Sequence, residues 1–248
     1  MRPTRNTTRL SATDIQQQMT HLATDVHRTA NRIKRRRSDL TDEGYRKEWG
    51  RLSADHKLRA AQLAQLPERW AQQAVTARDQ ARAALLPTTD DPAAQMAAEA
   101  TWQRVTSRPS YQSAEPAARW SMVRDAVQNM PASPARTLIL EEAVARGDAN
   151  PETVEALLVA TSDDYRAARD AANHAQTAAQ ILNRRAAGIM HSLDTVDADT
   201  PGALSTVDVT AVPGADTLRD TGIGTDVFDG PNVPDLPVNA ELPTGPGW

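Results

Sequence analysis

The stretch that decides the fold is residues 14–66, DIQQQMTHLATDVHRTANRIKRRRSDLTDEGYRKEWGRLSADHKLRAAQLAQL. Its first half places apolar or small side chains at alternating intervals of four and three residues, the 3.5-residue period of a coiled-coil seam. These positions are Ile15, Met19, Leu22, Val26, Thr29, Ile33 and Leu40. Such a seam becomes buried only against another helix, so the stretch predicts packed helices and an all-α fold.

The second half of the stretch supplies a partner seam. It consists of Tyr45, Trp49, Leu52, His56, Leu63 and Leu66, with Arg59 interrupting the ladder. Between the halves, Ser38, Asp39 and Thr41 can accept hydrogen bonds from the free N–H groups at the start of a helix. We therefore expect a helical hairpin. The alternative is one continuous helix, because only Gly44 at the junction is a poor helix former.

The composition favours elongated helices around a thin core. Leu, Ile, Val and Phe account for 41 of 248 residues, below the roughly 20% expected of ordinary globular chains. Much of the apolar class is alanine, which favours helix but buries little surface. The chain has no cysteine, which excludes disulfides, thiolate metal ligands and a cysteine nucleophile.

Neither a membrane-spanning segment nor a secretory signal is expected. No stretch approaches the roughly 18 apolar residues of a membrane helix, and no apolar run follows the N-terminal residues. We therefore expect synthesis in a cytoplasm and no membrane partner.

Changes in composition divide the chain into five segments. Residues 1–13 are expected to form a flexible basic arm, and residues 14–86 a long helical hairpin. Residues 87–160 predict a compact subdomain of short helices, and residues 161–193 a long helix with an alanine seam. Residues 194–248 contain seven of the eleven glycines and seven of the sixteen prolines, so they predict an extended, non-helical acidic tail.

Prolines mark expected helix starts. Pro67 indicates a kink or a new helix. Four later helices are expected to open with a capping residue followed by proline, and Gly147 is expected to end the third of them. The four pairs are Asp91-Pro92, Glu115-Pro116, Ser133-Pro134 and Asn150-Pro151. Trp102 and Trp120 recur at helical spacing in this segment, which favours a place in the core over a platform for stacking bases.

The last predicted helix has a small-residue seam. Ser162 can cap its start, and the seam consists of Tyr165, Ala168, Ala172, Ala175, Ala179, Leu182, Ala186, Ile189 and Leu193. Alanines at these positions allow two helices to approach closely. We expect this helix to pack either on the hairpin or on its own copy in a neighbouring subunit, which would make a homo-oligomer.

Charge is distributed unevenly along the chain. Residues 1–193 carry a formal net charge of +5 and residues 194–248 a net charge of −9. The candidate nucleic-acid contacts are Arg2, Arg5, Arg9, Arg32, Lys34, Arg35, Arg36 and Arg37. These cations could bind phosphates non-specifically, with the acidic tail as an internal competitor. The plainer interpretation is that the run at residues 32–37 complements the dipole of a helix C-terminus and stays solvated.

The tail contains candidate contacts for protein subunits of a larger assembly. They are Val207, Val209, Val212, Phe228, Pro231, Pro234, Pro237 and Trp248. The valines could add as a strand to a partner's sheet, the regularly spaced prolines favour a polyproline II course, and the aromatics could anchor a strap. The alternative is a disordered acidic tail.

Motifs of enzyme chemistry are missing from the sequence. It has no glycine-rich phosphate loop, nucleophile elbow or HExxH pattern, and the five histidines are not paired at helical spacing. They are His21, His27, His56, His174 and His191. We expect no catalytic residues, no metal site and no cofactor.

The basic run that leads into residues 40–45, the alanine seam and the tail together resemble the organisation of small helical structural proteins of tailed bacteriophages. These are scaffolding, minor head or connector-associated proteins. The resemblance implies a non-enzymatic virion component whose helical body oligomerises or packs on a shell and whose tail straps onto neighbouring subunits. The alternatives are a nucleic-acid-associated helical protein and a cellular coiled-coil adaptor.

Overall fold

The computed structural model describes residues 10–194 and 208–218. Within these ranges the chain forms eight α-helices and no strand. The all-α prediction is therefore confirmed. The expectations for residues 1–9, 195–207 and 219–248 lie outside the described residues.

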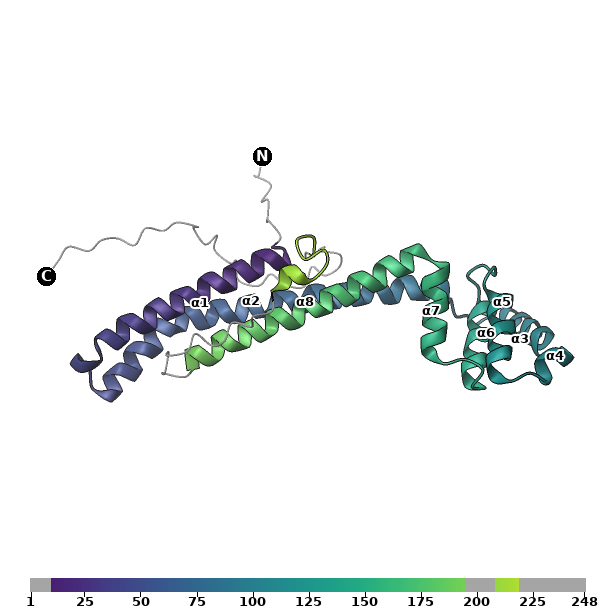
Figure 1. The fold of residues 1–248 in the computed structure, drawn as a ribbon, viewed down its shortest axis with the longest axis horizontal. Coiled ribbons are helices and arrows are strands. Elements are labelled where there is room, and N and C mark those ends of the chain that lie inside the picture. Colours follow the sequence, from purple (N-terminus) through teal and green to yellow (C-terminus); the bar gives the residue numbers. More distant parts are fainter. Residues whose placement is uncertain (1–9, 195–207, 219–248) are drawn as a thin grey trace, which may run out of the picture.

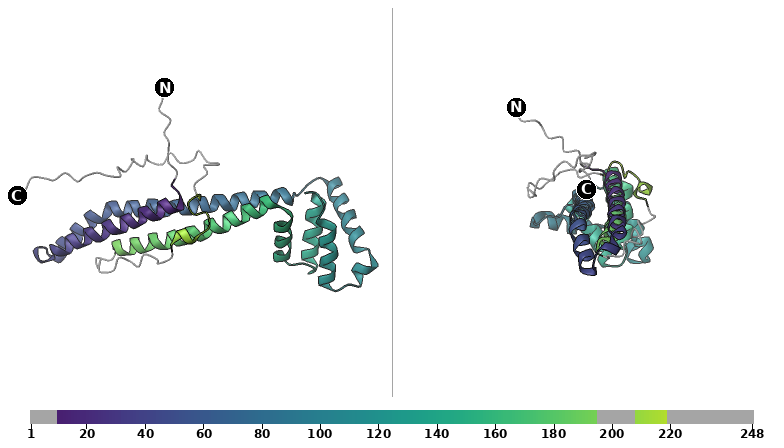
Figure 2. Two further views of the ribbon diagram at one scale, coloured as in Figure 1. Left: turned by 45° about the horizontal axis from the view of Figure 1, so that its top comes forward. Right: turned by 90° about the vertical axis from the view of Figure 1, so that its left-hand side faces the viewer.

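The molecule consists of a rod and a smaller head at one end of it (Figure 1; Figure 2). The rod contains α1 (Ala12–Arg35), α2 (Asp42–Leu85) and α8 (Asp163–Asp194). The head contains α3 (Pro92–Thr106), α4 (Pro109–Gln112), α5 (Pro116–Val127), α6 (Pro134–Ala145) and α7 (Pro151–Thr161). With 44 residues, α2 is about 66 Å long at a rise of about 1.5 Å per residue, and it runs from the far end of the rod to the head.

The hairpin prediction is confirmed, and the continuous-helix alternative is wrong. A short 3-10 helix, η1 (Arg37–Asp39), separates α1 from α2. Ser11 caps α1 through a capping box with Asp14. At the start of α2, Thr41 accepts a hydrogen bond from the Gly44 N–H at 3.1 Å. Both caps satisfy backbone donors that have no partner inside the helix.

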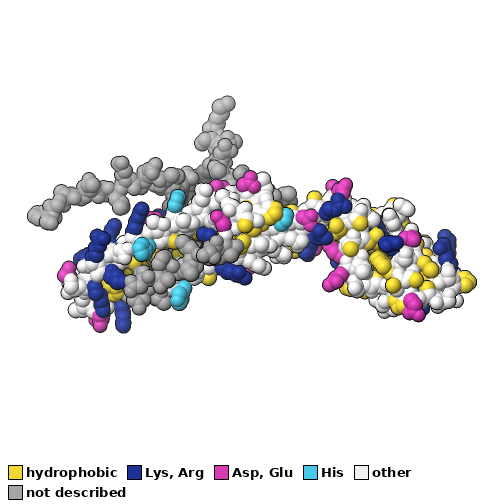
Figure 3. All heavy atoms as spheres, in the orientation of Figure 1, with side chains coloured by type: hydrophobic (Ala, Val, Ile, Leu, Met, Phe, Trp, Pro, Cys, Tyr) yellow, Lys and Arg dark blue, Asp and Glu magenta, His cyan; other side chains and the backbone are white. Residues whose placement is uncertain are grey.

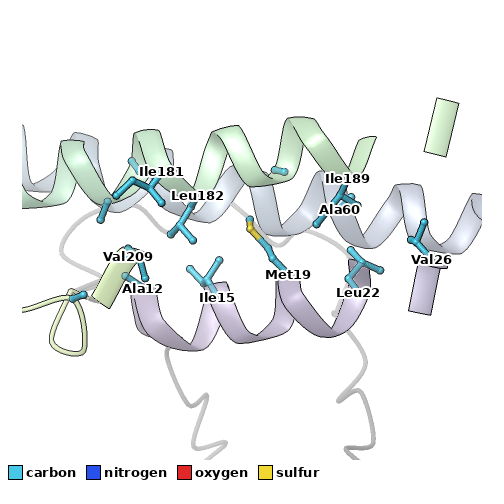
Figure 4. Close-up of a cluster of buried hydrophobic side chains, with 14 of the residues drawn as sticks. Ala12, Ile15, Met19, Leu22, Val26, Ala60, Ile181, Leu182, Ile189 and Val209 are labelled. Atoms are coloured by element: carbon cyan, nitrogen blue, oxygen red, sulfur yellow. The ribbon is translucent and has the colours of Figure 1, made fainter. Parts of the chain in front are cut away.

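The buried seam of α1 follows the predicted ladder, whereas on α2 only Trp49 of the predicted ladder is buried and its other five positions are half-buried. On α1 the ladder is buried at five positions, Ile15, Met19, Leu22, Val26 and Ile33, and Figure 4 shows four of these side chains directed toward α2 and α8. Ala30 is buried in place of Thr29, and Ala60 of α2 in place of Arg59. An α-helix has 3.6 residues per turn, so its buried stripe drifts away from a strict 3.5-residue ladder.

Of the two alternatives expected at Pro67, a kink or a new helix, the new helix is wrong, because α2 continues through this residue. Pro67 is buried, as are Trp70 and Ala71 in the next turn. A proline inside a helix removes one backbone hydrogen bond. The packing of α2 along α8 offsets that loss, since tertiary packing supplies most of the stability of a helix in a protein.

Helix α8 packs on the hairpin of its own chain, which is one of the two predicted alternatives. Its N-terminal cap is Ser162, whose hydroxyl accepts from the Tyr165 N–H at 3.1 Å. Every seam position from Tyr165 to Leu193 is buried except Ala168. Near its end, the Trp49 indole Nε1–H donates to the Leu193 carbonyl at 3.0 Å. The alanine seam is thus used within one chain.

In the head, all four predicted proline-led helix starts are found. The short helix α4, which opens with Pro109, was not predicted. Gly147 follows α6 with φ +75°, the left-handed conformation that ends helices. Trp102 is 1% exposed, which confirms its expected place in the core. The other buried residues of this core are Val105, Tyr111, Val123, Val127, Ile139, Leu140, Ala143, Val154 and Leu157.

Candidate interaction surfaces

The hairpin end of the rod carries a cluster of cations, which we call the basic tip. Its members are Arg32, Lys34, Arg35, Arg36, Arg37, Arg46 and Lys47, all of them exposed. Figure 3 shows Lys and Arg side chains gathered at this end. The hairpin extends beyond the end of α8 (Figure 1), so the basic tip forms the free end of the rod.

Acidic side chains neutralise the basic tip only in part. Residues 28–51 contain nine basic and four acidic residues. Arg37 is held in place, because it pairs with Asp42 and its guanidinium lies 4.5 Å from the centre of the Tyr45 ring. Within the described residues, Arg32 and Arg35 form no ion pair with another side chain. These two cations are available to an external anion.

The structure brings together the predicted cations from Arg32 to Arg37. It adds Arg46 and Lys47, which sequence reasoning missed. The signal for them was present: a hairpin places the first turns of its second helix beside the last turns of its first. Arg2, Arg5 and Arg9 lie outside the described residues.

The second surface is a piece of the C-terminal region, residues 208–218, which we call the docked segment. It lies on the rod where α1 begins, and Figure 4 shows Val209 beside Ala12. The segment contains the 3-10 helix η2 (Val209–Ala211). Val209, Val212 and Ala215 are 0%, 6% and 4% exposed and belong to the core of the rod.

Hydrogen bonds hold both ends of the docked segment. The Ala12 N–H, one of the free donors at the start of α1, donates to the Leu218 carbonyl at 3.1 Å. The Gln16 side chain accepts from the Val209 N–H at 2.7 Å and donates to the Asp208 carboxylate. The pKa of Asp208 is lowered because the Thr210 N–H, and then the Gln16 amide, donate to its charged form.

The strand predicted around the valines is wrong. Val209 and Val212 lie in and after a 3-10 turn and are buried on their own rod. The segment packs on the apolar surface at the start of α1 and bonds to Ala12 and Gln16. These contacts stabilise it more than the conformation of an isolated strand would. The other expected partner contacts, Val207, Phe228, Pro231, Pro234, Pro237 and Trp248, lie outside the described residues.

A groove of about 530 Å³ lies between α3 and α6 in the head. Pro92, Leu138 and Met96 line it, together with the carboxylates Glu99 and Glu141. Met96 is 69% exposed. No pattern in the sequence indicated this groove, because its two walls are about forty residues apart in the chain.

The buried polar groups of the head hold helices together. The Tyr111 hydroxyl donates to Asp148, and Arg119 Nη1 lies 3.5 Å from Asp148 Oδ1. Burial, and then the bond to Asp148, raise the pKa of Tyr111 to about 12. The Tyr165 hydroxyl donates to Glu155 at 2.7 Å, and burial is the largest cause of a pKa of about 12 there too. Both phenols stay protonated donors at neutral pH.

Neither a metal-binding cluster nor a membrane-spanning helix is found among the described residues. They contain no group of three or more His, Cys, Asp or Glu side chains placed to hold a metal ion. In the same part of the chain, no helix is both long and apolar enough to cross a membrane.

Comparison with protein-family models, with curated proteins and with solved structures gave no match. Any function must therefore be argued from the rod, the basic tip, the docked segment and the head.

Proposed function

We propose that this chain is a non-enzymatic structural protein of a larger assembly. The observation that carries the proposal is the continuity of α2 from the basic tip to the head. A helix of about 66 Å, packed along α8 and α1, holds two different surfaces at a fixed separation. A spacer of this kind works by holding its two binding surfaces, the basic tip and the head, where partners can contact both at once.

The assembly that we favour is a phage virion. The support is the resemblance in organisation described above: an Arg/Ala-rich helical body followed by a Pro/Gly-rich acidic extension. In this proposal the rod packs on a shell or on other copies of the chain, and the tail straps onto neighbouring subunits.

Light scattering coupled to gel filtration tests the proposal. We would compare the full-length protein with residues 1–218, which keep the docked segment, over a wide range of concentrations. A defined oligomer of the full-length protein, free of nucleic acid by its absorbance ratio, is the expected result. A full-length protein that remains monomeric at every concentration would contradict self-assembly.

The basic tip supports a second candidate function, the non-specific binding of nucleic-acid phosphates. Clustered cations release condensed counterions when they contact phosphates, so such binding weakens steeply with salt. In this candidate the acidic tail competes with nucleic acid for the tip. The two functions are compatible, since a protein on the inner face of a shell can touch packaged nucleic acid.

Fluorescence anisotropy with a labelled DNA duplex tests this candidate. Replacing Arg32→Gln and Arg35→Gln together should weaken binding and reduce the slope of log affinity against log salt by about 1 for each lost contact. The control is Arg104→Gln with Arg108→Gln, which removes the same charge from exposed sites on the head. Equal losses in the two double variants would show that the tip is not the binding surface.

A further inference from the structure

We propose that the docked segment is exchanged between copies of this chain, so that residues 208–218 of one copy occupy the rod of its neighbour. The inference rests on the proposed structural function and names the contact by which neighbouring copies are joined. Its receiving surface, which we call the seat, is the face of α1 and α8 around Ala12, Gln16 and Ile181.

The seat is specific for this segment. It takes up the apolar side chains of Val209, Val212 and Ala215. It also fixes the chain direction, because Gln16 binds the first residues of the segment and Ala12 binds the last. Another copy of the same eleven residues would satisfy every one of these groups, whereas a sequence without this spacing would leave donors unpaired.

The residues that join α8 to the docked segment are long enough for the segment to bind either its own seat or that of a neighbouring copy. Arg185 of α8 lies near enough for its charge to lower the pKa of Asp208, and α8 continues nine residues beyond it, to Asp194. Those nine residues cover about 14 Å at about 1.5 Å per residue. Residues 195–207 join Asp194 to the segment, and a chain of that length can span about 45 Å.

A neighbouring rod that lies parallel and in register would be within that reach. Packed helices have axes about 8–10 Å apart, so two such three-helix rods lying side by side bring their seats within roughly 20–30 Å. Exchange breaks and remakes the same contacts, which leaves only the linker entropy and the local concentration of seats to decide between the two states. In dilute solution the docked segment binds the seat of its own chain. In an assembly with fixed neighbours, binding to a neighbour's seat becomes comparably favourable.

The absence of cysteine from the chain makes a direct test possible with the full-length protein. One preparation carries Gln17→Cys, the residue of α1 that follows Gln16 of the seat, and a second preparation of different tag length carries Ala211→Cys in the docked segment. Both positions are exposed. The two proteins are mixed over a range of concentrations and treated with a flexible bismaleimide. A product that contains one chain of each tag length can form only across two molecules.

Three controls define the background and the mechanism. A single chain carrying both substitutions reports docking on its own rod. Arg104→Cys on the head, used in place of Gln17→Cys, measures joining by random collision. Adding Val209→Asp and Val212→Asp to the Ala211→Cys chain removes the apolar contacts, while Val209→Ile with Val212→Ile preserves them.

The expected result is a mixed cross-linked product that exceeds the collision background several-fold, increases with concentration, and is lost with the aspartates but kept with the isoleucines. A mixed product at the background level at all concentrations, with efficient joining in the double-cysteine chain, would overturn the proposal. Light scattering on the same samples separates the two ideas: an oligomer without exchange leaves self-assembly standing, and a monomer without exchange removes both exchange and self-assembly.

Discussion

At the scale of single residues, His56 gives the rod a pH-sensitive position. It lies half-buried between α1 and α2, where its Nε2 is 3.3 Å from the Thr29 hydroxyl. Its Nδ1 is buried and has no hydrogen-bond partner within the described residues. Burial lowers the pKa of His56, and the nearby charge of Asp25 opposes this shift only in part. The folded chain therefore resists protonation of this side chain.

The consequence is a loss of stability on acidification. An unfolded chain takes up the histidine proton near pH 6.5, whereas the folded chain does so only at a lower pH. Between these two values the unfolded state binds more protons, so the free energy of unfolding falls as the pH falls. Urea denaturation between about pH 7.5 and pH 5.5 should show a smaller fall for His56→Gln than for the unaltered chain. The control is His21→Gln on the exposed face of α1, and an equal effect of both variants would contradict the assignment.

Two buried tryptophans of α2 form a matched pair. Trp49 and Trp70 are 4% and 3% exposed. Trp49 Nε1 donates to the Leu193 carbonyl, whereas the Trp70 Nε1 has no partner in the described part of the chain. Trp49→Phe should therefore cost about 1–3 kcal/mol more than Trp70→Phe, because it alone leaves a buried carbonyl unsatisfied. Chemical denaturation measures this difference, and equal losses would mean that the bond to α8 contributes nothing.

At the scale of secondary-structure elements, two glycines make opposite predictions for the same substitution. Gly50 lies in the interior of α2, and a Cβ added there meets no atom within 4 Å. Gly50→Ala should stabilise the rod by about 1 kcal/mol. Gly147 has φ +75° after α6, so Gly147→Ala should destabilise the head by about 1–2 kcal/mol. Thermal unfolding of the two variants checks both signs, and a lower melting temperature for Gly50→Ala would show that α2 needs flexibility there.

Local signals were sufficient to predict most of these elements. The seam of α1, the cap at Thr41 and the proline-led starts of the head helices depend on residues at most a few positions apart, so one sequence reveals them. Two elements were missed for physical reasons. Four-residue α4 is too short for any periodicity, and the continuity of α2 through Pro67 depends on packing against α8, which begins about a hundred residues later in the chain.

The interaction surfaces were predictable to different degrees. Most of the basic tip comes from one run of sequence, and only Arg46 and Lys47 needed the hairpin. The docked segment depends on Gln16 binding Val209, a pair 193 residues apart. Val207, Val209 and Val212, in a stretch rich in Thr and Asp, suggested a strand. The seat that buries two of these valines does not exist until α1 and α8 have packed.

At the scale of the whole molecule, the described part of the chain has two separate hydrophobic cores. The rod core and the head core share no residue. At the junction between α7 and α8, Tyr165 binds Glu155 and Arg166 donates to the Val159 carbonyl at 2.8 Å, and the buried Leu158 and Tyr165 belong to neither core. Such contacts orient the head on the rod, but they couple the two cores weakly, since interfaces of this kind contribute less than a shared apolar core.

The two cores should therefore unfold separately. Ile15 and Ile139 are each 0% exposed, one in the rod core and one in the head core, so replacing either with alanine should cost about 2–5 kcal/mol where it lies. Hydrogen exchange followed by mass spectrometry resolves that cost along the chain. Ile139→Ala should accelerate exchange in α3, α5 and α6 and leave α1 protected, and Ile15→Ala should do the reverse. If either variant lowered protection equally in both parts, the junction would have to carry enough free energy to make one cooperative unit. The molecule would then be one rigid spacer whose head cannot open independently, and not a rod that carries a separately folded head.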